Sequence, residues 1–253
     1  MEKLIIPLLI FLGVQQSIIG QNNSLMMNGA YIKLNNGTQG TPIYMVVNQS
    51  DPLGINVNGG GHIISESEYN LVKWNTGATI GSYTIPFGYS TTNYLPVTVN
   101  KTSSGSPASG FLLCSTYSTA SNNLPWGEDV TNMNNAGGGG ELYVLDRWWI
   151  VDASSFSTTK PNVDLTFTYR DSEEYGAPNL ISEPSLQAQQ WDSDVNGWKA
   201  PSGVQSGNQV TINVTGANFF RNWVLSDIVL PLPVDLILFN TVCDGSKMKI
   251  EWE

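Results

Sequence analysis

The spacing of its short apolar runs is the feature that most constrains how this chain can fold. After residue 20, runs of β-branched and aromatic residues alternate with turn clusters rich in Asn, Gly, Ser and Pro. No stretch shows the 3.6-residue periodicity of a long amphipathic helix. The pattern predicts an all-β fold, with an antiparallel β-sandwich or jelly-roll-like domain over residues 21–230.

The first 20 residues have the organisation of an export signal. A charged start, Met1-Glu2-Lys3, precedes an apolar run from Leu4 to Val14, and a polar tract ends at Gly20. The apolar run is about eleven residues long, whereas a membrane-spanning helix needs about 20, and no later run approaches that length. We therefore predict a signal peptide over 1–20 that is cleaved after Gly20. The mature chain is expected to be secreted or on the cell surface, with no membrane span.

The expected strands follow one another at short intervals. They cover residues 30–34, 43–47, 55–57, 63–64, 71–74, 81–88, 96–100, 110–117, 141–151, 163–170, 185–191, 209–214 and 219–225. The first three are expected to form a β-meander. The stretch from Ala120 to Gly140 is rich in Asn, Gly and Pro and is expected to be a long surface loop.

A change in the pattern at Pro231-Leu232-Pro233 marks a domain boundary. Residues 234–243 and 247–252 are expected to be strands joined by the turn Asp244-Gly245-Ser246. Residues 231–253 are thus interpreted as a linker and the first hairpin of a partial β module. Because an isolated hairpin is marginally stable in water, we expect this one to belong to a longer module or to lean on the main domain.

Charge and cysteine content narrow the classes of partner. The net charge is −10, and the chain holds three arginines, Arg147, Arg170 and Arg221, so no basic stripe is present to bind nucleic acid. The charged fraction is 13%, but aromatic residues are plentiful, which argues against disorder. Cys114 and Cys243 could form a disulfide in an exported protein or remain two separate buried thiols.

Several segments resemble large, uncharacterised exported surface proteins of the Bacteroidota that use type IX secretion. The resemblance is carried by residues 59–68, 72–74, 83–88, 146–149, 165–169 and 186–191. In those relatives a phrase like Pro231-Leu232-Pro233-Val234-Asp235-Leu236 opens a fibronectin-type-III-like module, and a sorting domain follows it. The sorting domain is absent from this sequence. The resemblance implies an extracellular protein and transfers no catalytic residues.

Two groups of carboxylates were weighed for glycoside hydrolysis, which needs two carboxyl groups about 5 to 9.5 Å apart across the sugar. Glu66 and Glu68 are two residues apart on an extended segment, so they are expected to point in parallel along a solvated acidic edge. Asp171, Glu173 and Glu174 follow a strand and are expected to serve in a loop or in ion pairs.

A calcium site is the one cofactor that the sequence suggests. Asp192, Asp194 and Asn196 alternate as oxygen donors before a glycine, as in the start of an EF-hand loop. The twelfth position of that loop is Gly203, where a bidentate Glu belongs. A hairpin turn explains the same residues. His62 is the sole histidine, which excludes a histidine-rich zinc site.

Tryptophans supply the candidates for ligand binding. Trp126, Trp149 and Trp198 are candidates for stacking on sugar rings, although packing in the core or between modules explains most tryptophans in a sandwich of this size. Because neighbouring residues on a strand face opposite sides, one of Trp148 and Trp149 should enter the core while the other points outward or into an interface.

The sequence as a whole predicts a non-enzymatic structural or adhesive protein. A carbohydrate-binding module of a polysaccharide-processing system is the alternative, and a glycoside hydrolase is a more distant one. The expected partners are extracellular glycans or other surface proteins.

Overall fold

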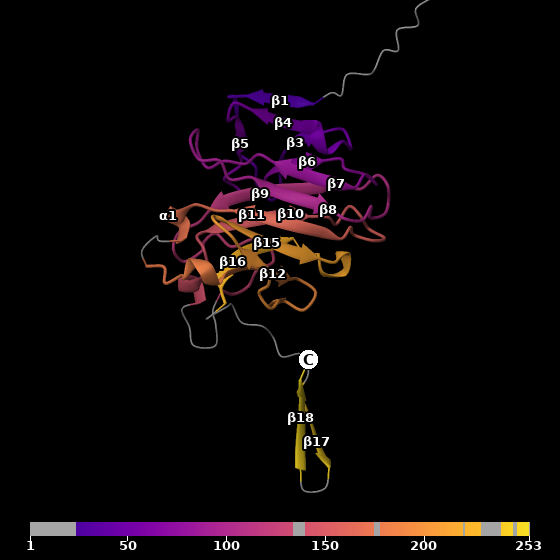
Figure 1. Cartoon of the computed structure of the whole chain (residues 1–253), viewed down its shortest axis with the longest axis vertical. Helices are drawn as coiled ribbons and strands as arrows, with labels where there is room; N and C mark the ends of the chain where they lie inside the picture. The colour runs from indigo at the N-terminus through magenta and orange to yellow at the C-terminus, as the bar shows by residue number, and fades with distance from the viewer. Residues whose placement is uncertain are drawn as a thin grey trace, which may run out of the picture.

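A computed structural model describes residues 24–133, 140–174, 178–219, 221–228, 239–244 and 247–252. Two sheets pack face to face in the body of the molecule, which confirms the predicted all-β sandwich (Figure 1). Among these residues the helices are single turns, such as α1 (Asp171–Glu174), and none is long and apolar enough to cross a membrane. The predicted signal peptide and the predicted 231–233 boundary lie outside the described residues.

The larger sheet has seven strands in the order β13-β12-β16-β10-β9-β6-β3. Neighbours are antiparallel except for the outermost pair, β3 and β6, which is parallel. The strands are β3 (Ile43–Val47), β6 (Asn70–Trp74), β9 (Leu112–Ser118), β10 (Arg147–Asp152), β12 (Leu186–Asp192), β13 (Gly197–Trp198) and β16 (Asn222–Asp227).

The smaller sheet has five antiparallel strands in the order β14-β15-β11-β8-β7. They are β7 (Gly81–Ile85), β8 (Val97–Lys101), β11 (Val163–Thr168), β14 (Val204–Gln205) and β15 (Gln209–Val214). Buried and exposed residues alternate along β15, as expected of a strand with one wet face. The inward residues of both sheets form one core, in which Trp149 and Trp223 flank Phe167.

The first 50 described residues form a two-turn parallel coil rather than the predicted meander. β1 (Leu25–Asn28) pairs in parallel with β4 (Ile55–Asn58), β2 (Tyr31–Lys33) with β5 (His62–Ile64), and β3 with β6. The turn containing β1 to β3 therefore lies on the turn containing β4 to β6, and it ends the body (Figure 1). Apolar side chains inside the coil, such as Met27 and Ile63, continue the sandwich core.

The segment from Thr119 to Met133 covers the outer face of the seven-stranded sheet, so its described part is not the free surface loop that was predicted. Met133 is buried in a second apolar cluster with Trp148, and Trp126 packs against that cluster. Backbone carbonyls of the segment accept hydrogen bonds from the rings beneath: Trp148 Nε1 donates to Asn123 (3.1 Å), Trp198 Nε1 to Asn132 (2.9 Å) and Tyr117 Oη to Pro125 (3.3 Å). The segment thereby supplies hydrogen-bond acceptors to the same donor groups that it buries.

A hairpin is present near the C-terminus, as predicted, formed by β17 (Phe239–Asp244) and β18 (Lys247–Trp252). Cys114 is fully buried in the core, and burial raises the pKa of its thiol. The side chain of Cys243 is not among those described, so the question of a disulfide with Cys114 lies outside the described residues.

Candidate functional site

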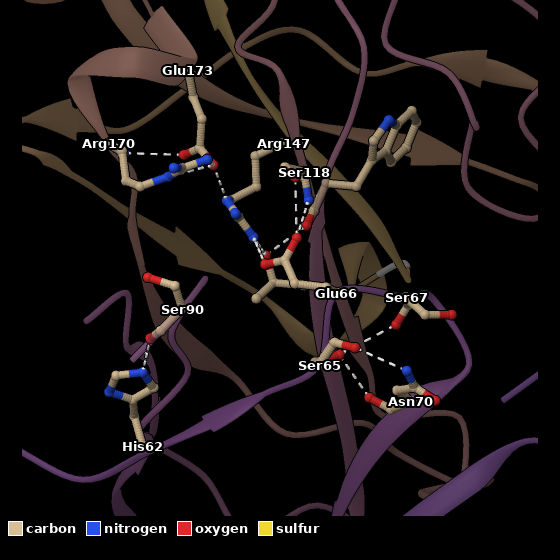
Figure 2. Close-up of polar contacts among 12 residues, drawn as sticks. His62, Ser65, Glu66, Ser67, Asn70, Ser90, Ser118, Arg147, Arg170 and Glu173 are labelled. Atoms are coloured by element: carbon tan, nitrogen blue, oxygen red, sulfur yellow. Dashed lines mark hydrogen bonds and ion pairs between the residues drawn. The ribbon is translucent and has the colours of Figure 1, made fainter. Parts of the chain in front are cut away.

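The segment from Ser65 to Glu68 carries two carboxylates that the sequence singled out, and buried hydrogen bonds fix its path. Ser65 Oγ donates to the carbonyl oxygen of Asn70 (2.7 Å), while Asn70 Nδ2 donates to the carbonyl oxygens of Leu34 and Ser65. Glu66 itself has a φ of 43°, a left-handed conformation that is uncommon for a residue other than glycine. The bend sends the two glutamate side chains to different arginines, Glu66 to Arg147 and Glu68 to Arg221. Figure 2 shows the first of these contacts.

Arg147, at the start of β10, is the centre of a buried ion-pair cluster (Figure 2). Its Nη1 lies 3.0 Å from Glu66 Oε1, and its Nε lies 2.6 Å from Glu173 Oε1. Arg170 Nη2 lies 2.8 Å from the same Glu173 oxygen. We call Glu66, Arg147, Arg170 and Glu173 the Arg147 cluster. Its two cations and two anions balance, which is the condition for keeping charges away from water.

Further contacts close the Arg147 cluster. The backbone N–H and the hydroxyl of Ser118 both donate to Glu66 Oε2, and the Tyr89 ring lies 3.8 Å from the Arg170 guanidinium. Arg147 is fully buried and Glu173 is 2% exposed. Burial raises the pKa of the adjacent Asp146 to about 6; a hydrogen bond with Asn179 opposes this shift and the charge of Glu173 adds to it.

A second ion-pair group forms around the second glutamate of the segment. We call Glu68, Glu128 and Arg221 the Arg221 cluster. Arg221 Nη1 contacts Glu68 Oε1 at 2.5 Å and Glu128 Oε2 at 3.0 Å. The backbone N–H of Glu128 donates to Glu68. Burial raises the pKa of Glu68 in spite of the arginine contact, so desolvation outweighs the attraction.

The two clusters correct one prediction and confirm another. Glu66 and Glu68 do not line a solvated acidic edge, because both bind arginine and Glu68 is 7% exposed. Glu173 serves in ion pairs, as predicted for the 171–174 group. No local spacing in the sequence could predict the pairing of Glu66 with Arg147, since the contact depends on how the coil joins the sheet.

An aromatic group was not anticipated. His62 on β5 is buried and lies edge-on to Tyr31 on β2, with ring centroids 4.7 Å apart, and Tyr94 lies 6.3 Å from it on another side. One ring nitrogen of His62 bonds to the carbonyl oxygen of Ser90 (Figure 2). Tyr31 and Tyr94 are each 45% exposed. Successive side chains on a strand face opposite sides, so an inward Ile32 implies an outward Tyr31. This alternation was the one sequence signal that could have predicted an exposed Tyr31.

The structure removes two of the three tryptophan candidates from the surface. Trp149 is fully buried between the sheets and Trp198 is 2% exposed, so neither can stack on a sugar. Trp148 points to the opposite side from Trp149, as alternation predicts, but the 119–133 segment covers it. Trp126 is partly exposed and packs against the same cluster, which contains Trp198, whereas Trp149 belongs to the core between the sheets.

The predicted calcium ligands form a turn between β12 and β13. Asp192 Oδ1 accepts the backbone N–H of Asp194 (2.9 Å), and Asp192 Oδ2 lies 2.8 Å from Lys199 Nζ. Asn196 has a φ of 55° and accepts a hydrogen bond from Thr131. The part of the chain that the structure describes brings no three His, Cys, Asp or Glu side chains into a metal-binding group. This geometry is that of the hairpin turn, which was the alternative to a calcium loop, and calcium binding stays a prediction.

An open depression of about 690 Å³ lies at the end of the sandwich. Five of its ten lining residues carry hydroxyl groups, and Lys160 is the one ionisable residue there; Lys160 donates to the carbonyl oxygen of Phe219 (2.8 Å). The depression contains no carboxylate and is separate from both arginine clusters. No family model, curated protein or solved structure matches the chain.

Proposed function

We infer that the chain is a non-enzymatic, secreted or cell-surface module with a structural or adhesive role. The observation that carries this inference is the use made of its acidic residues. Glu66, Glu68 and Glu173 each bind arginine, and the Arg147 cluster is charge-balanced and closed by Ser118 and Tyr89. Glycoside hydrolysis needs one free carboxylate and one proton-donating acid across a substrate. Both roles would require these ion pairs to break.

The predicted export signal and the resemblance to exported Bacteroidota proteins support an extracellular location. A balanced, buried charge cluster that joins the coil to the sheet supports a structural use of the charges. The expected partners are therefore extracellular glycans or other surface proteins, bound by the outside of the fold.

Attachment under flow tests this proposal. Beads coated with residues 21–253 are expected to resist detachment from surfaces bearing extracellular polysaccharide or protein, and to release no reducing sugar. Beads coated with heat-unfolded protein are the control. Release of reducing sugar that disappears in Glu66→Gln, with the fold retained, would contradict the non-enzymatic role.

Carbohydrate binding is the second candidate, and the exposed rings of Tyr31 and Tyr94 beside His62 favour it. Exposed aromatic rings stack on the apolar faces of sugars. A glycan array, run with and without calcium, is expected to show binding that Tyr31→Ser with Tyr94→Ser abolishes. Val204→Ser, at a 71% exposed site on β14, is the matched control and should bind as before. No binding by the unaltered protein would eliminate this candidate.

A further inference from the structure

Among the residues that the structure describes, the outer turn of the coil has a row of strand edges with no neighbouring strand. β3 is the last described strand of the seven-stranded sheet, and β1 and β2 each pair with one described strand. At the opposite end of the sheet the edge is β13, which has two residues. The smaller sheet ends in β14, also of two residues, and in β7, which packs against the turn Pro52–Gly54. Short edges are a common protection against strand addition. β3, with five residues and no proline or charge, lacks that protection.

Apolar side chains gather on the same outer turn. Met26, Tyr31, Ile43, Tyr44 and Val46 are between 38% and 56% exposed. On β3, the side chains of Tyr44 and Val46 point away from the coil interior, since Met45 and Val47 between and beyond them pack on the core. A cluster of exposed apolar residues along a strand edge is typical of a protein contact surface and not of a surface that stays in water.

The free backbone groups of β3 have a defined position. The N–H of Ile43 donates to Tyr69, and the carbonyl oxygen of Val47 accepts from Asn75, so the odd-numbered residues bond toward β6. In a parallel pair the alternate residues direct both polar groups the other way. The N–H and C=O groups of Tyr44 and Val46 therefore point outward, away from the sheet.

The charge of this turn selects the partner. Residues 24–47 contain one charged side chain, Lys33, and no acid, although the chain as a whole carries −10. Two copies of an acidic protein repel each other at most surfaces, but not at one that holds no acid. A second copy can meet the first here at the same surface, as a two-fold interface requires.

We propose that β3 pairs antiparallel with β3 of a second copy, about a two-fold axis at Met45, and so joins two seven-stranded sheets into one. In this register Tyr44 lies opposite Val46 of the second copy, and their outward N–H and C=O groups form reciprocal hydrogen bonds. The same register places an aromatic ring against a β-branched side chain on each side of the axis, which is a favourable cross-strand pair.

Light scattering on residues 21–253 across a concentration series tests the proposal. The unaltered protein is expected to reach twice the monomer mass. The double variant Tyr44→Lys, Val46→Lys sets ammonium groups opposite each other and should weaken dimerisation at least about tenfold. The corresponding double glutamate variant should also be monomeric, and mixing the two variants should restore the dimer. Val204→Lys, on the edge strand β14, is the control and should leave the dimer unchanged.

A monomer at every concentration, a dimer that survives the double lysine substitution, or an open-ended polymer would overturn the proposal. If the variants unfold, amide hydrogen exchange of the unaltered protein decides. Protection of Tyr44 and Val46 that rises with protein concentration supports the two-fold pairing, and concentration-independent exchange contradicts it.

Discussion

The Arg147 and Arg221 clusters hold the same short segment, yet they differ in their access to water. The side chains of Arg147 and Glu173 are 0% and 2% exposed, with those of Glu66 and Arg170 each 20% exposed around them. In the Arg221 cluster, the side chain of Glu68 is 8% exposed, but those of Arg221 and Glu128 are 23% and 33% exposed. Both clusters have short ion-pair distances. Water can replace a lost partner at Arg221 and Glu128, but not at Arg147 and Glu173.

This difference implies that the number of ion pairs says little about their contribution to stability. Removing one partner of a buried pair leaves a charge with neither solvent nor counter-ion. Removing one partner at the surface exposes the other to water. The Arg147 cluster should therefore respond strongly to substitution, and the Arg221 cluster weakly.

Arg147→Ala should have the largest effect. It takes the arginine contact from Glu66 and leaves Glu173 with Arg170 alone, so the free energy of unfolding should fall by about 3–5 kcal/mol. Urea denaturation followed by tryptophan fluorescence measures the change. A loss below about 1 kcal/mol would mean that water enters the cluster.

Glu66→Gln should have the next largest effect. The amide keeps an oxygen for the Ser118 N–H but removes the charge that faces Arg147, so we expect a loss of about 1–3 kcal/mol. Glu128→Gln, in the exposed cluster, is the matched control and should change stability by less than about 0.5 kcal/mol. Equal losses in the free energy of unfolding of the two variants would contradict the distinction between the clusters.

Asp146→Asn should stabilise the protein at neutral pH. The folded pKa of Asp146, about 6, is above its ordinary value of 3.8, so the folded state holds the proton more tightly. Its stabilising contribution is complete below pH 3.8 and is lost as pH rises through 6. Asp146→Asn should therefore gain about 1–3 kcal/mol at pH 7 and little at pH 4. A gain that does not change with pH would show that the carboxyl is not responsible.

Arg221→Ala should have the smallest effect. We expect a loss of about 1 kcal/mol that shrinks as salt is added, because the exposed side of this cluster is screened. Thermal unfolding at low and high ionic strength measures it. A loss as large as that of Arg147→Ala would contradict the assignment of this cluster to the partly hydrated class.

Much of the fold could be predicted from local patterns. The strands at 43–47 and 209–214 were predicted with the bounds observed, because alternation and flanking turns are encoded locally. The parallel coil was missed, although Asn28-Gly29 and Asn58-Gly59 lie 30 residues apart and begin equivalent bends. The paired strands are offset by 30, 31 and 27 residues, so a comparison of the segments at one fixed period would have detected only part of this repeat.

The candidate site was less accessible to sequence reasoning. Arg147 and Glu66 are 81 positions apart, and only the packing of the coil on the sheet brings them together. Alternation predicted that Trp148 and Trp149 face opposite ways, but it could not predict that the 119–133 segment covers Trp148. Long-range burial of this kind depends on the tertiary fold, whereas strand alternation does not.

The central claim is that Glu66, Glu68 and Glu173 act as structural partners of arginine. A double-mutant cycle on Glu66→Gln and Arg147→Ala measures that partnership most directly, through the free energy of unfolding of both single variants and the double variant. The structural account predicts a coupling of about 1–3 kcal/mol between the two side chains. Losses that add to within about 0.3–0.5 kcal/mol would show that the two residues do not depend on each other, and would contradict it.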